Sequence, residues 1–191
     1  MEKQKLIKTI TRIAVVAAIY ATFTIFTTPI SFGVVQFRLA EILVLLCFFK
    51  KDYCYSLVIG CFIANIFSPD LGIIDCIFGT FHTLVSVIII SKLKNIYLAS
   101  LVPAVLMFII AFELKVFIEV PESFMFTYVL LFVEELVVVG IIGIPVFKLL
   151  TMSKTFCKVA IEWKIKASQV SDAFNLLFNS SFWDWVIATF R

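Results

Sequence analysis

The chain has 191 residues, of which 62% are hydrophobic and only 15% are charged, and its formal net charge at neutral pH is +3. Its mean hydropathy of +1.11 lies well above the range of water-soluble domains. This composition excludes a soluble globular protein and predicts an all-α integral membrane protein. Because one spanning helix needs about 20 apolar residues, the chain can hold at most about six or seven spans, with no independent soluble domain.

The amino-terminal stretch is basic and then apolar, as in a signal peptide. The apolar run continues to Pro29 without a clear small-residue cleavage site, which favours a retained first membrane helix. Within this helix Ala14 and Ala18, and again Ala17 and Ala21, lie four residues apart and form flat small-residue surfaces. Such a surface either packs inside the bundle or docks a separate membrane partner.

Helix-breaking residues divide the rest of the chain into further apolar segments. The predicted helices are 9–28, 38–50, 53–67, 73–91, 97–118 and 124–149. The second is too short to cross a hydrocarbon core of about 30 Å unaided, so we expect it to be tilted or to end inside protein. The sequence thus predicts a six-helix membrane domain over residues 1–151. A cytoplasmic tail over 152–191 follows it, either as an amphipathic helix on the membrane surface or as a poorly ordered appendage.

Charged residues alternate between the two sides of the predicted membrane domain. The start of the chain, the second and fourth connections and the end of the sixth helix are basic, whereas the loops on the opposite side are acidic. The positive-inside rule therefore predicts that both termini are cytoplasmic. The basic group comprises Lys3, Lys5, Lys8, Arg12, Lys50, Lys51, Lys92, Lys94, Lys148 and Lys154, and the acidic group comprises Asp70, Glu119 and Glu122.

Several polar and ionisable residues fall within the predicted spans. A charge at a helix centre costs about 2.5 to 3.5 kcal/mol on insertion scales, so these residues are expected to pair or to line a wet cavity. Five acids against Arg38 and Lys115 give a formal balance of −3, which favours a cationic ligand. Snorkelling and structural ion pairs are the alternative, and they account better for Lys115 and Arg38 than for the deep Glu134 and Glu135. The acids are Glu41, Asp75, Glu113, Glu134 and Glu135.

A membrane enzyme is the alternative class of function, with Glu134, Glu135 and His82 as its reactive groups. His82 is the only histidine, however, and the sequence contains no HExxH, no paired DxxD and no glycine-rich phosphate loop. A single histidine in a membrane helix is more often a packed, hydrogen-bonded group than a ligand. The sequence therefore predicts neither a metal site nor a cofactor, and no catalysis.

Three segments together resemble the QueT family, the queuosine-precursor substrate-binding subunits of energy-coupling factor (ECF) transporters. They are "VVQFRLAEILVLL", "GCFIANIFSPDLGIIDCIFGTFHTL" and "VEELVVVGIIGIPVF", within a resemblance that covers about residues 9–150. The resemblance implies a six-transmembrane-helix bundle of the ECF substrate-binding type in a bacterial plasma membrane. It also implies a pocket open to the outside. The implied partners are an ECF transmembrane coupling subunit and two ABC ATPase subunits, with Ala14, Ala17, Ala18 and Ala21 on the docking helix.

The implied ligand is a 7-deazaguanine such as preQ1, or queuine or queuosine; another vitamin-like solute is the alternative. One carboxylate can accept the adjacent N–H donors of a guanine-like edge, and a second can pair with the cationic aminomethyl group. Amide or guanidinium groups can donate to the ring carbonyl, and a phenylalanine can stack on the base. The predicted substrate-binding residues are Gln36, Phe37, Arg38, Glu41, Asn65, Asp75, Phe78, His82, Glu113, Glu134 and Glu135.

Overall fold

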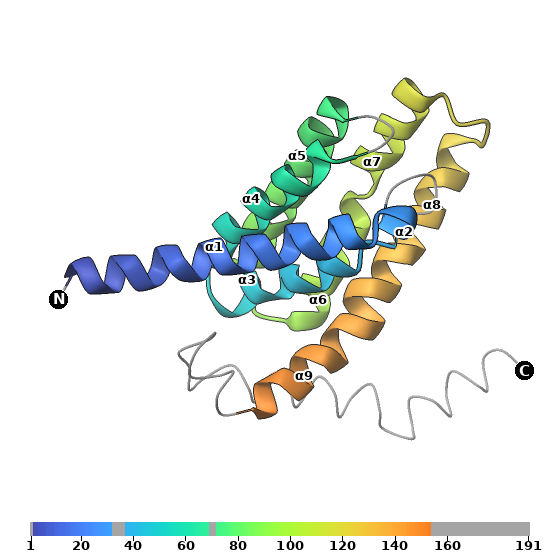
Figure 1. Ribbon diagram of the computed structural model, residues 1–191. Coiled ribbons are helices and arrows are strands. Elements are labelled where there is room, and N and C mark those ends of the chain that lie inside the picture. Colours follow the sequence, from blue (N-terminus) through green and yellow to red (C-terminus); the bar gives the residue numbers. More distant parts are fainter. Residues whose placement is uncertain (1, 32–36, 69–71, 154–191) are drawn as a thin grey trace, which may run out of the picture.

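The computed structural model describes residues 2–31, 37–68 and 72–153, and these residues form helices and connections without any strand. Figure 1 shows the helices gathered into a bundle, with the amino-terminal end of α1 projecting beyond it. Three segments are regular or nearly so. They are α1 (Glu2–Phe26) with the single turn α2 (Thr28–Ser31), α4 (Tyr53–Ile66) and α5 (Ile73–Ile90).

The other three segments change helix type along their length. The 3₁₀ helix η1 (Leu39–Leu45) continues as α3 (Leu46–Phe49). The next segment consists of α6 (Ile96–Leu106), α7 (Phe108–Glu113) and the π-helix η2 (Leu114–Ile118). The last consists of α8 (Phe124–Glu135), the π-helix η3 (Leu136–Gly143) and α9 (Ile144–Met152).

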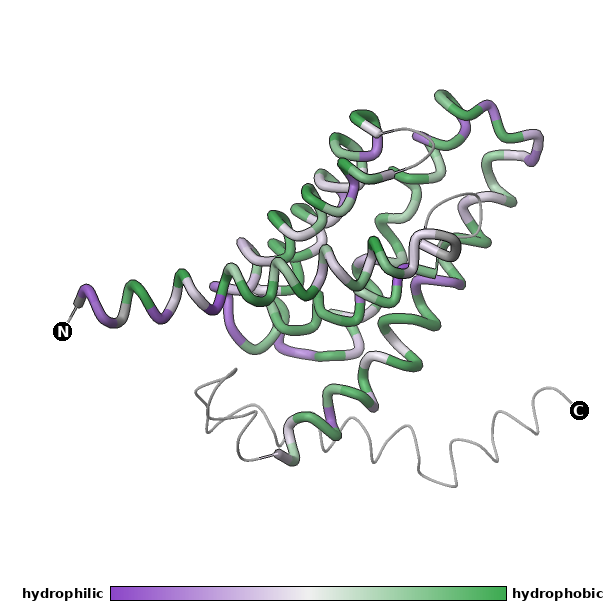
Figure 2. The backbone as a smooth tube through the Cα atoms, viewed as in Figure 1, coloured by the Kyte–Doolittle hydropathy of each residue, from purple (hydrophilic) through white to green (hydrophobic). Residues whose placement is uncertain are grey.

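The helix lengths suit a membrane bundle. Within the described ranges, 4 segments are long and apolar enough to span a bilayer, and Leu39–Phe49 and Tyr53–Ile66 are shorter apolar helices. Large hydrophobic side chains are exposed along the bundle, and Phe26 is 85% exposed, as expected for a surface that faces lipid. Figure 2 shows this hydrophobic character along most of each helix. The predicted all-α membrane bundle is confirmed.

Local chemistry explains some of the helix boundaries. The side chains of Asn95 and Ser123 accept hydrogen bonds from backbone N–H groups at the starts of α6 and α8, at 2.9 and 3.3 Å. The first helix begins at Glu2 and ends at Phe26, rather than covering 9–28, and Pro29 lies in the separate turn α2, where proline is tolerated. The predicted bounds of that helix were therefore wrong at both ends.

The short segment η1 lies at the centre of the packing. It contacts α1, α4, α5, α6 and η3. Its residues Val44 and Leu45 are fully buried in the main hydrophobic core. A smaller second core joins α7 to α8 around Ala111 and Leu131. Because neighbours surround η1 on several sides, it need not span the bilayer itself, as expected from its length.

The basic and the acidic residues of the connections lie at opposite ends of the bundle. The connections that hold Lys50, Lys51 and Lys92 lie toward the end from which α1 projects, and the turn at Glu119–Ser123 lies at the other end (Figure 1). Asp70 and the tail from residue 154 onward lie outside the described residues. The described connections therefore keep the basic and acidic sets apart.

Helix α1 packs closely on α4 because Gly60 has no side chain. A Cβ at this position would lie 2.9 Å from the Ala17 carbonyl oxygen and 2.9 Å from the Tyr20 Cβ. Small residues allow membrane helices to approach in this way.

Substituting Gly60 tests this contact. We expect Gly60→Ala to lower the free energy of unfolding by about 1 to 3 kcal/mol, because the helix backbone must move apart. The measurement is thermal unfolding of the purified protein in detergent. Gly140→Ala is the matched control, since the nearest atom there would lie 3.4 Å from the new Cβ. Equal losses in the two variants would contradict the close contact.

Candidate functional site

A buried guanidinium marks the start of η1. Arg38 is only 4% exposed, and its Nε donates a hydrogen bond to the Ser31 carbonyl oxygen at 3.1 Å. Glu41 and Asp75 are among its electrostatic neighbours, and so are Glu113 and Glu135. These acids belong to η1, α5, α7 and α8. Four helical segments therefore each contribute an acid to the surroundings of Arg38.

Glu41 is held from the first helix. The Tyr20 hydroxyl donates to Glu41 Oε1 at 2.5 Å, and both residues are 1% exposed. Glu41 Oε2 is buried and has no hydrogen-bond partner within the described part of the chain. One carboxylate oxygen is thus fixed by protein, and the other remains available to accept.

Asn65 and Asp75 join the end of α4 to the start of α5. The Asn65 amide donates to the Asp75 carbonyl oxygen at 3.0 Å, and the Ser68 hydroxyl donates to the Asp75 carboxylate. A Cβ at Gly79 would lie 2.4 Å from the Asn65 amide nitrogen and 3.4 Å from an Arg38 terminal nitrogen. Gly79 therefore makes room for a polar cluster that includes Arg38.

Glu113 and Glu135 are buried acids at the points where an α-helix becomes a π-helix. Glu113 precedes η2 and Glu135 precedes η3, and they are 0% and 1% exposed. Neither carboxylate has a hydrogen-bond partner among the residues described. Glu113 lies near Asp75, whereas Glu135 lies near Glu41 and Glu134. The acids therefore form two groups, and Arg38 is a neighbour of both.

His82 has a backbone partner outside this cluster. Its Nε2 lies 3.1 Å from the Pro103 carbonyl oxygen, and because a carbonyl oxygen only accepts, Nε2 carries the proton in this contact. Pro103 lies shortly before the break between α6 and α7, where the Met107 N–H donates to the Ala104 carbonyl oxygen, one residue closer than a regular α-helical partner. The structure thus gives His82 a structural partner, although it lies in electrostatic range of Arg38.

The two predicted aromatic residues lie at different places. Phe37 packs against the main hydrophobic core. The ring centroid of Phe78 is 6.3 Å from that of Phe112 and 5.6 Å from that of Phe117, and those two rings are about half exposed on the outside of the bundle. Neither phenylalanine has a described contact with the acids. Gln36 lies outside the described residues.

Lys115 belongs to a loop rather than to the cluster. Its ammonium donates to the carbonyl oxygens of Val120 and Glu122, at 2.7 and 3.0 Å. Without Lys115, the predicted site residues comprise five acids and one cation, Arg38, so their formal balance with every acid ionised is −4 rather than −3. The excess of negative charge is therefore larger than expected.

The four predicted docking alanines divide between two faces of α1. Ala17 and Ala21 are 4% and 5% exposed and point into the bundle, whereas Ala14 and Ala18 are exposed. Ala18 lines a shallow surface groove with Val15, Ile19, Thr22 and Phe23. The inner pair is thus used for packing, and only the outer pair is available to a partner.

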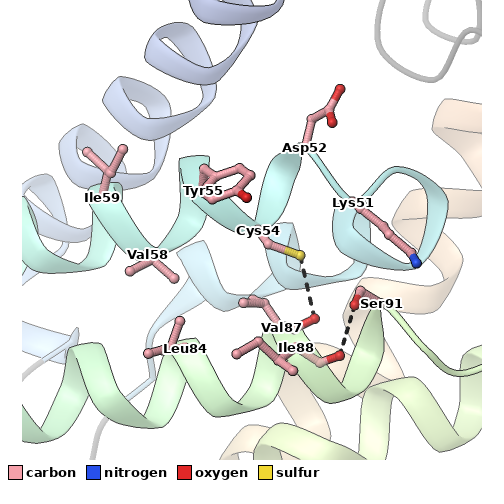
Figure 3. A pocket seen from close by; sticks show the side chains of 10 residues that line it. All are labelled: Lys51, Asp52, Cys54, Tyr55, Val58, Ile59, Leu84, Val87, Ile88 and Ser91. Atoms are coloured by element: carbon pink, nitrogen blue, oxygen red, sulfur yellow. Dashed lines mark hydrogen bonds between the residues drawn. The ribbon is translucent and has the colours of Figure 1, made fainter.

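A second groove lies outside the cluster of acids. Figure 3 shows it between α4 and α5, near the turn at Lys51. Its volume is about 470 Å³. Its wall includes Cys54, whose Sγ donates to the Val87 carbonyl oxygen at 3.6 Å. It contains none of the predicted site residues, and its remaining lining is mostly apolar. The candidate site is therefore the cluster around Arg38.

Two residues of the cluster were not predicted from the sequence. Tyr20 shares one helical face with Ala17, Ala21 and Thr24, a spacing that could have indicated a buried hydroxyl. Ser68 lies in the connection after α4, where nothing in the sequence distinguishes it. Within the described ranges, no group of three or more His, Cys, Asp and Glu side chains is arranged to hold a metal ion.

Removing the arginine tests whether it holds the acids together. We expect Arg38→Gln to lower the free energy of unfolding by about 3 to 5 kcal/mol, because it leaves buried carboxylates without their cation. The loss should shrink as the pH falls, since protonation removes the uncompensated charges. Unfolding would be followed thermally at several pH values. Lys115→Gln is the control and should cost no more than about 2 kcal/mol, with little change with pH. Equal losses with equal pH dependence would contradict a special role for Arg38.

Comparisons with known proteins match most of this chain to one family. A family model described as QueT transporter matches residues 10–152. A curated protein of Lactococcus lactis subsp. cremoris (strain MG1363), named queuosine precursor transporter QueT, is 35% identical over 140 residues, which cover 63% of this chain and 80% of that protein. No solved structure matches. The match covers most of the chain and includes every predicted site residue, and its family consists of transporters. We conclude that this multi-pass membrane protein is not an enzyme and that it belongs to the QueT transporter family.

Proposed function

We propose that this protein is the membrane-embedded substrate-binding subunit of an ECF-type importer and that it captures a queuosine precursor. The observation that carries the proposal is the excess of buried carboxylates around Arg38, between the helices of an apolar bundle. The name of the Lactococcus relative supports the choice of solute. The excess favours a ligand that brings a positive charge, as an aminomethyl deazaguanine does.

The two groups of acids suit the two ends of such a ligand. Glu135, with Glu41 and Glu134 nearby, can pair with the aminomethyl cation. Asp75 and Glu113 can accept the adjacent N–H donors of the guanine-like edge. Arg38 and Asn65 can donate to the ring carbonyl. The cation of the proposed ligand thus offsets negative charge in the group around Glu135, and its N–H donors satisfy the carboxylate oxygens of Asp75 and Glu113.

Uptake against a gradient needs a source of energy, and the sequence contains no nucleotide-binding loop. We propose that an ECF coupling subunit and two ABC ATPases supply it. The docking surface is the outward face of α1 that contains Ala14 and Ala18. In this arrangement the protein lies in a bacterial plasma membrane, with the basic connections and both termini in the cytoplasm.

Neutral replacements of the acids test the ligand. Glu135→Gln keeps the shape of the side chain but removes one charge-assisted pair, which contributes about 1.5 to 3 kcal/mol, or roughly ten- to a hundredfold in affinity. Calorimetric titration with the aminomethyl base and with guanine, which lacks the cation, would measure the effect. We expect a large loss for the aminomethyl base and a small one for guanine.

Glu41→Gln is the matched variant, and its effect should be smaller because Arg38 and Tyr20 already engage Glu41. Equal losses for the two bases in Glu135→Gln would assign Glu135 to the guanine edge instead. Unchanged affinity for both bases, in a variant that still binds, would remove Glu135 from the site.

A bulky residue on α1 tests the docking surface. Ala18→Trp should prevent co-purification with the coupling subunit and the ATPases while leaving the affinity for the aminomethyl base unchanged, because the surface must be flat. Val129→Trp, which adds the same bulk at a residue of α8 that is 52% exposed, is the control and should assemble normally. Normal assembly of Ala18→Trp would rule out this face.

A further inference from the structure

Tyr20 is a buried tyrosine whose hydroxyl lies where three segments meet. It projects from α1, donates to Glu41 of η1 at 2.5 Å, and lies beside Cys61 of α4. The Cys61 sulfur also accepts from Thr83 at 3.2 Å and from Asn65 at 3.3 Å. The hydroxyl of Tyr20 is therefore part of the polar layer that contains the candidate site, although its helix contributes no acid to that layer.

The hydrogen bond from Tyr20 restricts the carboxylate of Glu41. A carboxylate on a free side chain can rotate and exchange its two oxygens, whereas a bond to one oxygen fixes both. Here Oε1 accepts from Tyr20, and Oε2 is buried with no partner among the described residues. The bond thus selects which oxygen can accept from a ligand and in which direction.

The position of Tyr20 is itself fixed by close packing. Its Cβ lies against Gly60 of α4, where an added Cβ would be only 2.9 Å away, so α1 and α4 approach closely at Tyr20. Its side chain is 1% exposed, so water does not compete for the hydroxyl. A rigid helix contact therefore places the donor, and the donor places the acid.

We infer that Tyr20 is a positioning residue for substrate: its hydroxyl holds Glu41 so that one carboxylate oxygen is presented to the bound base. This inference rests on the proposed function, because it requires that a base binds at the cluster around Arg38. It adds a residue that makes no proposed contact with the ligand and acts only through Glu41.

Removing the hydroxyl alone tests the inference. Tyr20→Phe retains the ring and its packing, and we expect it to weaken binding of the aminomethyl deazaguanine about tenfold in calorimetric titration, because Glu41 is no longer oriented. In a Glu41→Gln background the same substitution should change the affinity less than about twofold, since the acid that it positions is absent. A role limited to packing predicts the same loss in both backgrounds.

Two further variants complete the experiment. Tyr128→Phe removes a hydroxyl that donates to the Val105 carbonyl oxygen at 3.3 Å, away from the acids, and should leave the affinity unchanged. Replacing Tyr20 by 3-fluorotyrosine keeps the donor and should keep the affinity within about twofold. The binding stoichiometry reports the folded fraction of each variant, so misfolding is distinguished from weak binding.

The outcomes separate this inference from the function on which it rests. An unchanged affinity in Tyr20→Phe, or equal losses with and without Glu41, would overturn the inference while the proposed function stands. A folded wild-type protein that binds neither the aminomethyl base nor guanine would overturn the proposed function, and the inference with it.

Discussion

The structure depends on how one buried guanidinium is accommodated inside an apolar bundle. Arg38 is 4% exposed, and a charge at such a place is tolerated only when opposite charges and acceptors surround it. The surrounding acids come from η1, α5, α7 and α8, so the cation links segments that are distant in sequence. The acids outnumber the cation, however. The remaining negative charge can be offset only by protons or by a cationic group from outside, and the second possibility is the electrostatic basis of the proposed binding site.

Irregular helix geometry accompanies the acids. Glu41 lies in a 3₁₀ helix, and Glu113 and Glu135 each end an α-helix at the point where a π-helix begins. Each change of helix type alters the angle between successive side chains, which allows an acid to point inward while the residues on either side of the segment still face lipid. Such segments have weaker backbone hydrogen bonding, and they persist here because tertiary packing encloses them, as the contacts of η1 with α1, α4, α5, α6 and η3 show. The irregular geometry and the site therefore occur together.

The sequence predicted the segments of this fold better than the directions of its side chains. Apolar runs between breakers placed six helical segments and identified the second and third as short, because a membrane imposes length and composition directly. Rotation about each helix axis was less predictable, since both the lipid-facing and the inward-facing sides are apolar and give little periodic signal. For that reason Ala17 and Ala18 could not be assigned to different faces, and neither the Pro103 partner of His82 nor the ring contacts of Phe78 were foreseen. The changes of helix type and the role of Tyr20 arise from packing between segments, which a single sequence does not specify.

The two faces of α1 connect the site to the surface of the protein. The inner face, with Ala17 and Tyr20, packs on α4 at Gly60 and holds Glu41, while Ala18 on the outer face lines a shallow groove. Neighbouring residues of one rigid helix thus serve a buried carboxylate and an exposed surface. In the inferred arrangement the ligand contacts Glu41 Oε2, so the hydrogen bond from Tyr20 to Oε1 stays in place when substrate binds. Through this bond α1 takes part in the candidate site as well as in the surface of the protein.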